Sequence, residues 1–346
     1  MEKEKSLLFS QSPLCPIAAD VISDGESIYL YLYDLDFDSE RLIAHCACWV
    51  KNLVEAPLVF DTKKIEGNGQ PALPVAYCGE MDLKEWKEED LEIVWNPSGD
   101  MAGLYHQDML VCILPYSKKE NGCGFAHYAK ENSVVAWKME EGSLFLSQIE
   151  AGRSFWKQEF NLTWRDYNTS YFEDLCKRFG KAKQCFDLHK DEFPTRLLVT
   201  FEQDTLCYGA TIGCGMFYMP QAHECYEDWQ KEGKSEFVFC HHQDSFTEEE
   251  LMDVYAQMAG LCEVPWHTIR CIAHGHTLDM KLKDCHYAII IDDDHMEQPF
   301  DFRIKKEGVH MLWIVSISDQ EFEDAHDKTK RDALIQDIIK NHRYEI

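Results

Sequence analysis

Cysteine and histidine side chains are concentrated in the second half of the chain, where they could bind zinc. A tetrahedral zinc site takes four such ligands, commonly as close pairs along the chain. Two close pairs are present, His223/Cys225 and His274/His276, but no two cysteines of this half are separated by two residues. We therefore expect no bound metal and interpret the thiols as core residues and the histidines as surface or hydrogen-bonded ones. The residues concerned are Cys207, Cys214, His223, Cys225, Cys240, His241, His242, Cys271, His274, His276, Cys285 and His286.

Other motifs of catalysis or cofactor binding do not occur in the sequence. There is no G-x-x-x-x-G-K-[ST] loop, no G-x-G-x-x-G after a strand and no G-x-S-x-G elbow, and no cysteine-hydrolase signature surrounds any of the fifteen cysteines. The run Asp292 to His295 resembles a cation-binding segment but lacks the glycine and distal glutamate of a calcium loop, so we interpret it as a solvated turn. Gly213-Cys-Gly215 is too short to cradle a phosphate and indicates backbone crowding or a bulge. We expect no catalytic residue and no cofactor.

Aromatic side chains are the better candidates for function. Tyr29, Tyr31 and Tyr33 alternate along one predicted strand and so share a face, while Trp164 and Tyr167 precede a predicted helix. Tyrosine and tryptophan combine apolar area with a polar group and are common at binding hot spots. We predict that these five residues bind a partner; the alternative is that they pack in the core or between domains.

Short strands separated by turns are predicted for the first half. Ile28, Leu30 and Leu32 alternate with the tyrosines over Ser27 to Asp34, the period of a strand. Segments rich in glycine, proline and asparagine separate the candidates, as in Asn96-Pro-Ser-Gly. The further strands are expected at Ala44 to Val50, Leu91 to Trp95, Met109 to Leu114 and Ser133 to Lys138.

The second half mixes strands with helices. Ser170-x-x-Glu173, Thr247-x-x-Glu250 and Ser318-x-x-Glu321 are possible capping boxes, predicting helices from about 171 to 186, from 247 and from 318. Tyr287 to Ile291 and Val309 to Ile317 are continuously apolar, which favours strands at the centre of a sheet covered on both faces. The remaining strands are expected at Arg196 to Glu202, Tyr208 to Tyr218 and Ser235 to His241.

The predicted fold class is α+β with two domains, each a mixed or mainly antiparallel sheet with flanking helices. A length of 346 residues exceeds the size at which one core stops growing. The polar segment from Asp187 to Pro194 suggests a boundary, giving residues 1–190, which end in a linker helix, and residues 191–346.

The charge balance bears on partners and location. Sixty-two acidic and thirty-four basic side chains give a net charge of -28, which repels nucleic acid and anionic membranes but could steer a basic protein. The N-terminal sequence has no signal-peptide pattern, and no window is apolar enough to span a membrane. Fifteen cysteines, an odd number in a chain of this size, then suggest free thiols in a reducing cytoplasm.

The second half also resembles a known family. PTRLLVTF, then AHGHTL with Gly275, His276 and Thr277, and finally VHMLWIVSISDQEFEDA from Val309 through Glu321 are similar to the Suppressor of fused (SUFU-like) domain family, over about 194 to 341. The sequence departs from that pattern at Val315-Ser316-Ile317, where a proline is usual before the isoleucine or leucine. No family is identified for residues 1 to 190.

The resemblance implies a protein-binding module and not an enzyme. The eukaryotic family member holds a transcription factor, gripping an extended peptide that adds as a strand in a cleft between its two domains. Bacterial members look like immunity or accessory proteins of toxin systems. We expect a bacterial, cytoplasmic protein that sequesters a protein partner, such as a basic toxin domain; the alternative is a metal-binding regulator or metal-dependent enzyme that uses the Cys/His-rich half. The oligomeric state stays open.

Overall fold

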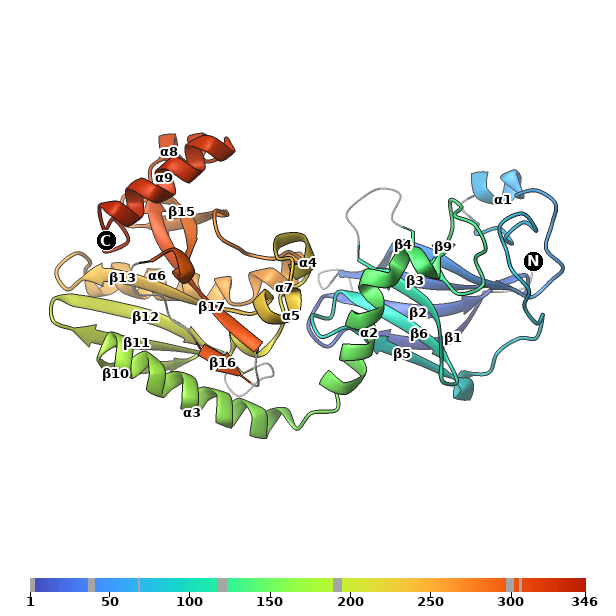
Figure 1. Cartoon of the computed structure of the whole chain (residues 1–346), viewed down its shortest axis with the longest axis horizontal. Helices are drawn as coiled ribbons and strands as arrows, with labels where there is room; N and C mark the ends of the chain where they lie inside the picture. Colours follow the sequence, from blue (N-terminus) through green and yellow to red (C-terminus); the bar gives the residue numbers. More distant parts are fainter. Residues whose placement is uncertain are drawn as a thin grey trace. The chain divides into compact units, whose positions relative to one another are not determined.

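The computed structural model describes residues 4–36, 41–67, 69–116, 123–188, 195–296, 302–304 and 307–346 (Figure 1). The chain forms two compact units, Met1–Gln158 and Glu159–Ile346, each with its own sheets and flanking helices. The α+β class with mainly antiparallel sheets is confirmed. This division precedes the expected boundary at 190, because the helix and strand before residue 190 pack on the second unit. The expected linker overlaps residues 189–194, which lie outside the described part.

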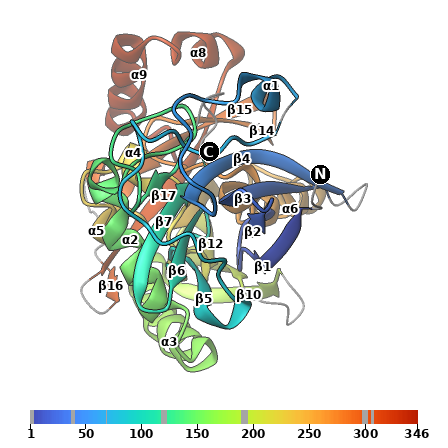
Figure 2. The ribbon, with the colours of Figure 1, turned by 90° about the vertical axis from the view of Figure 1, so that its right-hand side faces the viewer.

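In its described residues, the first unit is built from two facing sheets and two α-helices (Figures 1 and 2). Ile28, Leu30 and Leu32 are fully buried on one face of β3, and β3 packs on β7 of the second sheet. The alternation seen in the sequence therefore produces a strand with one face in the core. The first sheet has the order β1 (Lys5–Gln11), β2 (Ile17–Ser23), β3 (Ser27–Asp36), β4 (Arg41–Asn52). The second has the order β5 (Leu91–Trp95), β6 (Met101–His106), β7 (Met109–Pro115), β8 (Phe125–Ala126), β9 (Trp137–Lys138). The helices are α1 (Thr62–Glu66), α2 (Ser143–Phe155) and the short 3-10 segments η1 (Glu88–Asp90) and η2 (Met139–Gly142).

The second unit is built on an eight-stranded sheet with the order β10-β11-β12-β13-β17-β15-β14, and β16 pairs with β17. Its strands are β10 (Lys181–Asp187), β11 (Leu197–Gln203), β12 (Leu206–Ile212), β13 (Ser235–His242), β14 (Thr277–Leu282), β15 (Cys285–Asp292), β16 (Phe302–Ile304) and β17 (Glu307–Ile317). Its helices are α3 (Phe160–Phe179), α4 (Ala222–Cys225), α5 (Trp229–Glu232), α6 (Glu248–Leu261), α7 (Val264–Thr268), α8 (Asp319–Asp324), α9 (Lys328–Lys340) and the 3-10 segments η3 (Cys214–Met216) and η4 (Asp293–His295).

Helices cover both faces of this sheet. Phe179 of α3 stacks on Tyr208 of β12 at 4.4 Å between ring centroids, while the next residue, Gly209, faces Tyr255 of α6. Successive strand residues point to opposite faces, so α3 and α6 lie on opposite sides. The central position predicted for the apolar runs is confirmed, since β17 lies between β13 and β15.

The three possible capping boxes have different outcomes. Thr247 and Ser318 cap α6 and α8 with both hydrogen bonds of the box, as predicted. Ser170 instead lies inside α3, which begins at Phe160. The helix expected over 171 to 186 is therefore wrong at both ends. Gly180 ends α3 with φ of +82°, and a Cβ there would meet the carbonyl oxygen of Glu202 at 2.7 Å, so the chain turns into β10 and pairs with β11.

A buried carboxylate shapes the turn after β12. Glu236 of β13 is fully buried, and its Oε1 accepts hydrogen bonds from the backbone N–H groups of Gly213 and Gly215 at 2.7 and 2.9 Å. Gly213 has φ of +118°, and a Cβ on Gly215 would meet the Tyr167 hydroxyl at 2.5 Å. The predicted crowding at Gly213-Cys-Gly215 is thus explained by a backbone that wraps a carboxylate.

The last residues of the chain extend the same sheet. β17 pairs with β13 in parallel only as far as Trp313 opposite Val238 and continues along β15. Beyond that point, Ile346 donates to the carbonyl of Cys240 at 3.2 Å and accepts from His242 at 2.9 Å. The C-terminal segment therefore occupies the place beside β13 that β17 leaves.

Two further expectations from the sequence concern membrane-spanning segments and disulfide bonds. Of the helices in the described ranges, none combines the length and the apolar character that crossing a bilayer requires. None of the fifteen cysteines, all of which lie in the described ranges, forms a disulfide bond.

Candidate functional site

The three tyrosines predicted as binding residues lie on the outer face of the first sheet. Their ring centroids are 6.2 Å apart from Tyr29 to Tyr31 and 5.8 Å apart from Tyr31 to Tyr33. Tyr29 is only 2% exposed, and its hydroxyl donates to the carbonyl of Pro71. Tyr31 and Tyr33 are half-buried. The row therefore runs from a covered end to an open one, and only Tyr31 and Tyr33 present surface.

The surroundings of the open tyrosines are acidic. Burial raises the pKa of Tyr31, with Glu4 adding to the effect, and burial and then Asp20 raise the pKa of Tyr33. Asp20 lies across from Tyr31 in the sheet, is 9% exposed and accepts the Ser6 hydroxyl at 2.6 Å. Protonated phenols beside carboxylates offer a ring face and negative charge, both of which attract a cation.

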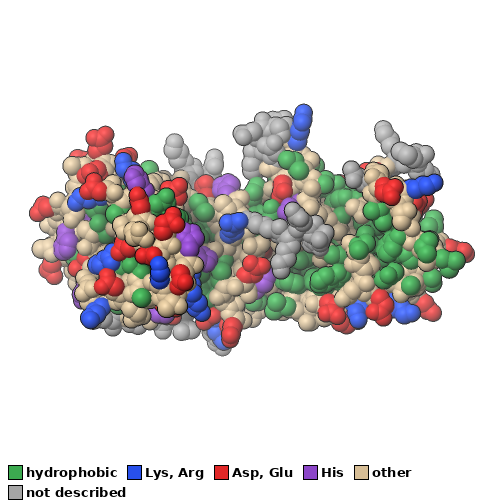
Figure 3. All heavy atoms as spheres, turned by 90° about the horizontal axis from the view of Figure 1, so that it is seen from above, with side chains coloured by type: hydrophobic (Ala, Val, Ile, Leu, Met, Phe, Trp, Pro, Cys, Tyr) green, Lys and Arg blue, Asp and Glu red, His purple; other side chains and the backbone are tan. Residues whose placement is uncertain are grey.

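Apolar side chains border the same sheet. Phe9 of β1 pairs with Asp20, and Leu42 and Ile43 lie on β4, the edge strand; these side chains are 44%, 48% and 53% exposed. Figure 3 shows hydrophobic side chains gathered on one face of this unit. Other exposed apolar residues of the unit include Leu58, Val59 and Val75. Exposed apolar area of this kind is typical of an interaction surface.

Trp164 and Tyr167 lie on α3 in the second unit. The Tyr167 hydroxyl donates to Glu236 at 2.6 Å and its ring stacks on Tyr171, with 2% of the residue exposed. Burial, followed by the Glu236 charge, raises the pKa of Tyr167. Trp164 is half-buried and donates its indole N–H to the carbonyl of Thr195 at 3.0 Å. Tyr167 is therefore a core residue that positions Glu236, whereas Trp164 keeps part of its surface.

The paired histidines of the sequence bind backbone groups. His274 Nδ1 accepts the N–H of Asp292 at 3.1 Å, and His276 Nδ1 accepts the N–H of Ala273 at 3.2 Å. Burial, together with neighbouring His295, lowers the pKa of His274 to about 4. Its ring stacks on His295 at 3.9 Å. His274 thus holds the loop before β14 against the end of β15, whereas the His276 side chain stabilises the loop internally.

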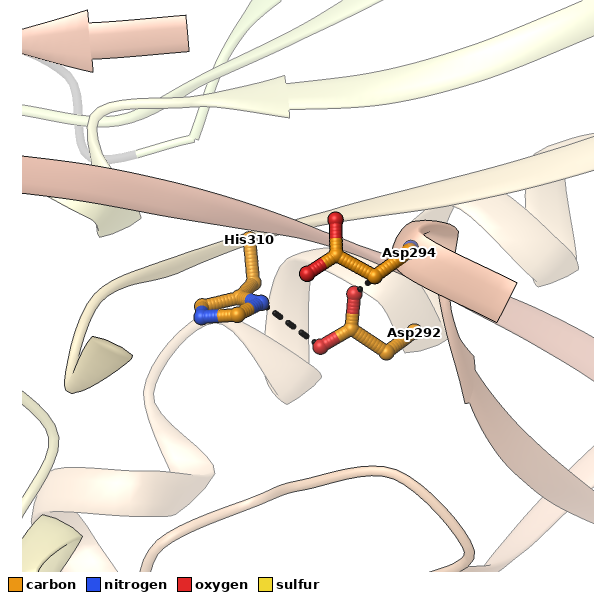
Figure 4. A group of neighbouring side chains, drawn as sticks. All are labelled: Asp292, Asp294 and His310. Carbon is orange, nitrogen blue, oxygen red and sulfur yellow. Dashed lines mark hydrogen bonds and ion pairs between the residues drawn. The ribbon is translucent and has the colours of Figure 1, made fainter. Parts of the chain in front are cut away.

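A different group of ligand-type side chains does come together. Asp292, Asp294 and His310 offer one ligand atom each within 4.8 Å of one another, and Figure 4 shows the two carboxylates and the ring converging. Among the described residues, no other group of three or more His, Cys, Asp or Glu side chains brings its ligand atoms this close together. Two carboxylates and an imidazole suit a divalent cation such as Zn²⁺ or Mn²⁺.

Without a cation, Asp292 is hydrogen-bonded to both of the other residues of this group. His310 Nδ1 lies 2.6 Å from Asp292 Oδ2, and the N–H of Asp294 donates to Asp292 Oδ1 at 3.1 Å. Burial lowers the pKa of His310, but the hydrogen bond and charge of Asp292 outweigh it, and the net pKa is raised. An ion pair between Asp292 and protonated His310 is therefore favoured.

Asp293 corrects the prediction of a solvated turn at Asp292 to His295. It is 1% exposed, and the Arg178 guanidinium of α3 donates to both its oxygens at 2.6 and 2.7 Å. The indole of Trp313 donates to the same carboxylate at 2.7 Å. Burial raises the pKa of Asp293 against these bonds. The middle of the acidic run therefore anchors η4 to α3 and β17.

A small cavity lies beside this ion pair within the second unit. Its volume is about 260 Å³, and its walls include Arg178, Phe179, Tyr208, Trp313 and Tyr344. Trp313 and Tyr344 meet edge to face at 5.4 Å. The cavity is smaller than the usual pocket for a drug-sized ligand.

Sequence reasoning missed both Asp20 and His310. Asp20 lies in β2, a strand that was not predicted, and its only signal is a carboxylate within the apolar run Ile17 to Ile22. His310 begins the apolar run of β17, and nothing local links it to Asp292. Their partners become visible only through strand pairing, because each lies on a different strand.

Comparisons with known proteins agree with the fold of the second unit. Residues 198–346 match the family described as Suppressor of fused protein (SUFU). No curated protein matches this chain in sequence. The matched segment runs from the second residue of β11 to Ile346, so it contains β12 to β17 and α4 to α9 but neither α3 nor β10.

Proposed function

We propose that this protein, whose residues 198–346 match the Suppressor of fused family, is a non-enzymatic binding module that sequesters a protein partner, as an immunity or accessory protein. The family match is the observation that carries the proposal, because domains of this family bind proteins. The setting proposed is a bacterial cytoplasm, where the fifteen thiols stay reduced.

The partner proposed is basic, such as a toxin domain. The net charge of -28 favours encounter with a positively charged protein and disfavours nucleic acid. Complementary fields raise the association rate, and salt screens them. Affinity should therefore fall as the salt concentration rises.

The surface proposed to meet the partner is the open end of the tyrosine row. Tyr31 and Tyr33 lie half-buried next to Asp20, and the same sheet carries exposed Phe9 on β1 and exposed Leu42 on β4. A lysine or arginine could lie over a tyrosine ring toward the carboxylate, while apolar side chains pack around it. Trp164 is a further candidate in the second unit. Buried Tyr29 supports the tyrosine row from its covered end, whereas Tyr167 packs inside the second unit against Glu236.

The experiment has two stages. The full chain is used as bait, and a retained protein is then purified and its Kd measured at low and high salt. The double variant Tyr31→Ala/Tyr33→Ala should weaken binding at least about tenfold, since hot-spot truncations cost about 2 kcal/mol or more. Tyr128→Ala, another half-buried tyrosine of the same unit, is the matched control. Absence of any stoichiometric partner would count against sequestration, and salt-independent affinity would count against the basic partner.

The cluster Asp292, Asp294 and His310 favours a second candidate, a metal-binding regulator or metal-dependent enzyme. The observation is the convergence of its ligand atoms within 4.8 Å. Calorimetric titration with Zn²⁺ or Mn²⁺ tests it, with Asp294→Asn as the variant. Stoichiometric binding that this variant abolishes would support the metal function, whereas no uptake of either ion would remove it.

A further inference from the structure

Arg196 is a buried arginine at the start of β11. It directly precedes this strand and is only 3% exposed. Its guanidinium lies over the ring of Trp266 in α7, 4.6 Å from the ring centroid, and Trp266 is itself buried. An arginine side chain does not lose its proton in proteins, so a full positive charge is enclosed at this point of the second unit.

The charge of Arg196 has no counter-ion among the described residues. Within the described ranges its guanidinium forms no hydrogen bond and no ion pair, and its Nε is fully enclosed without a partner. An enclosed charge is costly unless it is paired and hydrogen-bonded. The Trp266 ring attracts the cation but provides no acceptor oxygen for its N–H groups. The N–H donors of Arg196 therefore require an acceptor from outside the described residues.

Two less buried arginines of the same unit have the partner that Arg196 lacks. The side chain of Arg178 is 20% exposed and donates to both oxygens of Asp293 at 2.6 and 2.7 Å. The side chain of Arg343 is 35% exposed and donates to Glu321 at 2.6 Å. Carboxylates are plentiful in a chain with sixty-two acidic side chains, yet the most enclosed of these three arginines has none. We therefore expect its carboxylate on a ligand.

The segment that carries Arg196 reaches the surface. Thr195 and Leu197 on either side of it are half-buried, and half-buried Trp164 of α3 donates its indole N–H to the Thr195 carbonyl. The two Nη nitrogens of Arg196 are not among the fully enclosed unpaired atoms, whereas Nε is. The outer end of the guanidinium is thus its accessible end, and this end carries the N–H groups that a carboxylate binds in pairs.

The charge of the whole chain selects among anions that fit an arginine. A guanidinium binds carboxylates and phosphates with the same two-bond geometry. A net charge of -28 repels an anion more strongly as the charge of that anion grows. A carboxylate carries one negative charge, whereas a phosphate on a side chain carries about -1.5 to -2 at pH 7. A carboxylate is therefore the anion that Arg196 favours.

We propose that Arg196 is a binding site for the carboxylate group of a ligand, held through paired hydrogen bonds to the guanidinium. A free small carboxylic acid and an acidic side chain of another protein present the same two oxygens to this site. The ligand pairs the charge and supplies acceptors for the N–H groups, so its binding stabilises the folded state. The assignment does not depend on which protein the tyrosine row of the first unit binds.

The first test titrates the full chain with acetate, with chloride holding the ionic strength constant. The signal of ¹³C-labelled acetate should broaden on binding, and the thermal midpoint of the protein should rise with acetate concentration. Acetamide, which has the same size but no charge, should have neither effect. Arg196→Lys keeps the charge but loses the paired geometry, so acetate should bind at least about tenfold more weakly.

Arg196→Met should abolish the acetate response altogether. Exposed Arg270, which follows α7, supplies the matched control, and Arg270→Met should respond to acetate like the wild type. Acetate effects that are absent from the wild type, or that persist in Arg196→Met, would overturn the proposal. Stronger binding of inorganic phosphate than of acetate would overturn the choice of a carboxylate.

The stability of the empty protein separates a ligand site from a purely structural contact. Without acetate, Arg196→Met should melt at the wild-type temperature or above it, because methionine still packs on Trp266 and the unpaired charge is gone. A lower midpoint for this variant, together with a wild type that does not respond to acetate, would show that Arg196 serves packing alone. Where Arg196→Met does not fold, the wild type and Arg196→Lys decide the question through acetate binding.

A second probe distinguishes the two sources of the carboxylate. The α-amide of N-acetylglutamate presents the acidic side chain of a protein, whereas acetate presents a free small acid. Tighter binding of the glutamate derivative would assign the site to a protein ligand, and tighter binding of acetate would assign it to a small carboxylate. Failure of both probes to bind the wild type would overturn the proposal.

Discussion

Glu236 shows how one buried side chain fixes a whole turn. Its carboxylate accepts from Tyr167, Thr211, Gly213 and Gly215, at 2.6 to 2.9 Å, and none of it is exposed. Burial nevertheless raises its pKa. The four donors share this acceptor, so its removal would leave them unpaired in the interior.

Replacement of Glu236 should separate the effect of charge from that of hydrogen bonding. Glu236→Leu should lower the free energy of unfolding by about 3–5 kcal/mol, because buried donors lose their acceptor. Glu236→Gln keeps the carbonyl oxygen for the two glycine N–H groups and should cost about 1 kcal/mol. Urea unfolding of the full chain measures both variants, and equal losses would show that the charge itself is what matters.

The buried side chain of His241 should make the stability of the protein depend on pH. It is 2% exposed, its Nδ1 is bonded to the carbonyl of His242 at 2.8 Å, and its Nε2 has no hydrogen-bond partner among the described residues. Burial lowers its pKa below the usual 6.5. The neutral ring therefore contributes stability that is present above about pH 6.5 and lost as the pH falls through the folded-state pKa.

His241→Phe should flatten this part of the pH profile. Phe239 and Phe246 already contact the ring, so phenylalanine should fit with less than about 1 kcal/mol change at pH 7.5. Between pH 7.5 and 5 the variant should gain about 1 kcal/mol on the wild type for each unit by which the pKa was lowered. Denaturant unfolding at both pH values measures the difference; parallel profiles would contradict a neutral buried ring.

At the scale of elements, the sequence predicted strands better than helix ends. The strands at β3, β5, β7, β11, β13, β15 and β17 follow from alternation or continuous apolar runs, and the structure contains them. The residues of β10 were predicted as helix, because the local sequence does not show that they pair with β11. The sequence did contain the correct stop signal, since Gly180 follows Phe179 directly.

The candidate site was less predictable than the fold. Alternation placed Tyr29, Tyr31 and Tyr33 on one face, and they do lie in a row. The Tyr29 end of the row is covered because its hydroxyl donates to the carbonyl of Pro71, a residue far from it in the sequence. Burial at a given position is a tertiary property, and periodicity alone cannot supply it.

The capping boxes provide a matched pair of substitutions. Thr247→Ala should cost about 1 kcal/mol, because the N-terminal N–H groups of α6 lose the threonine hydroxyl. Ser170→Ala should be neutral or slightly stabilising, since Ser170 is an exposed position inside α3 where alanine is the better helix former. Thermal unfolding of both variants measures this contrast; equal destabilisation would mean that α3 starts near Ser170.

At the scale of the whole molecule, the division at Gln158 has a direct test. α3 contributes Tyr167, Tyr171, Leu175 and Phe179 to the core of the second unit, each at most 2% exposed. The fragment 159–346 should therefore unfold cooperatively on heating. The fragment 191–346 lacks these side chains and should show no cooperative transition. Circular dichroism measures both, and similar melting curves would place α3 outside the core.

The central position of β17 also sets an order of events in time. Among the described strands, β17 is the last to be synthesised. It nevertheless pairs in parallel with β13, with His310 of β17 opposite Ser235 of β13. Contacts between residues so far apart form slowly, because a long loop must close first. While the chain is being made, β13 and β15 must wait with open edges for the strand that joins them. Folding of the second unit is therefore expected to finish only after translation has passed β17, which makes the nascent chain most vulnerable to misassembly in that interval.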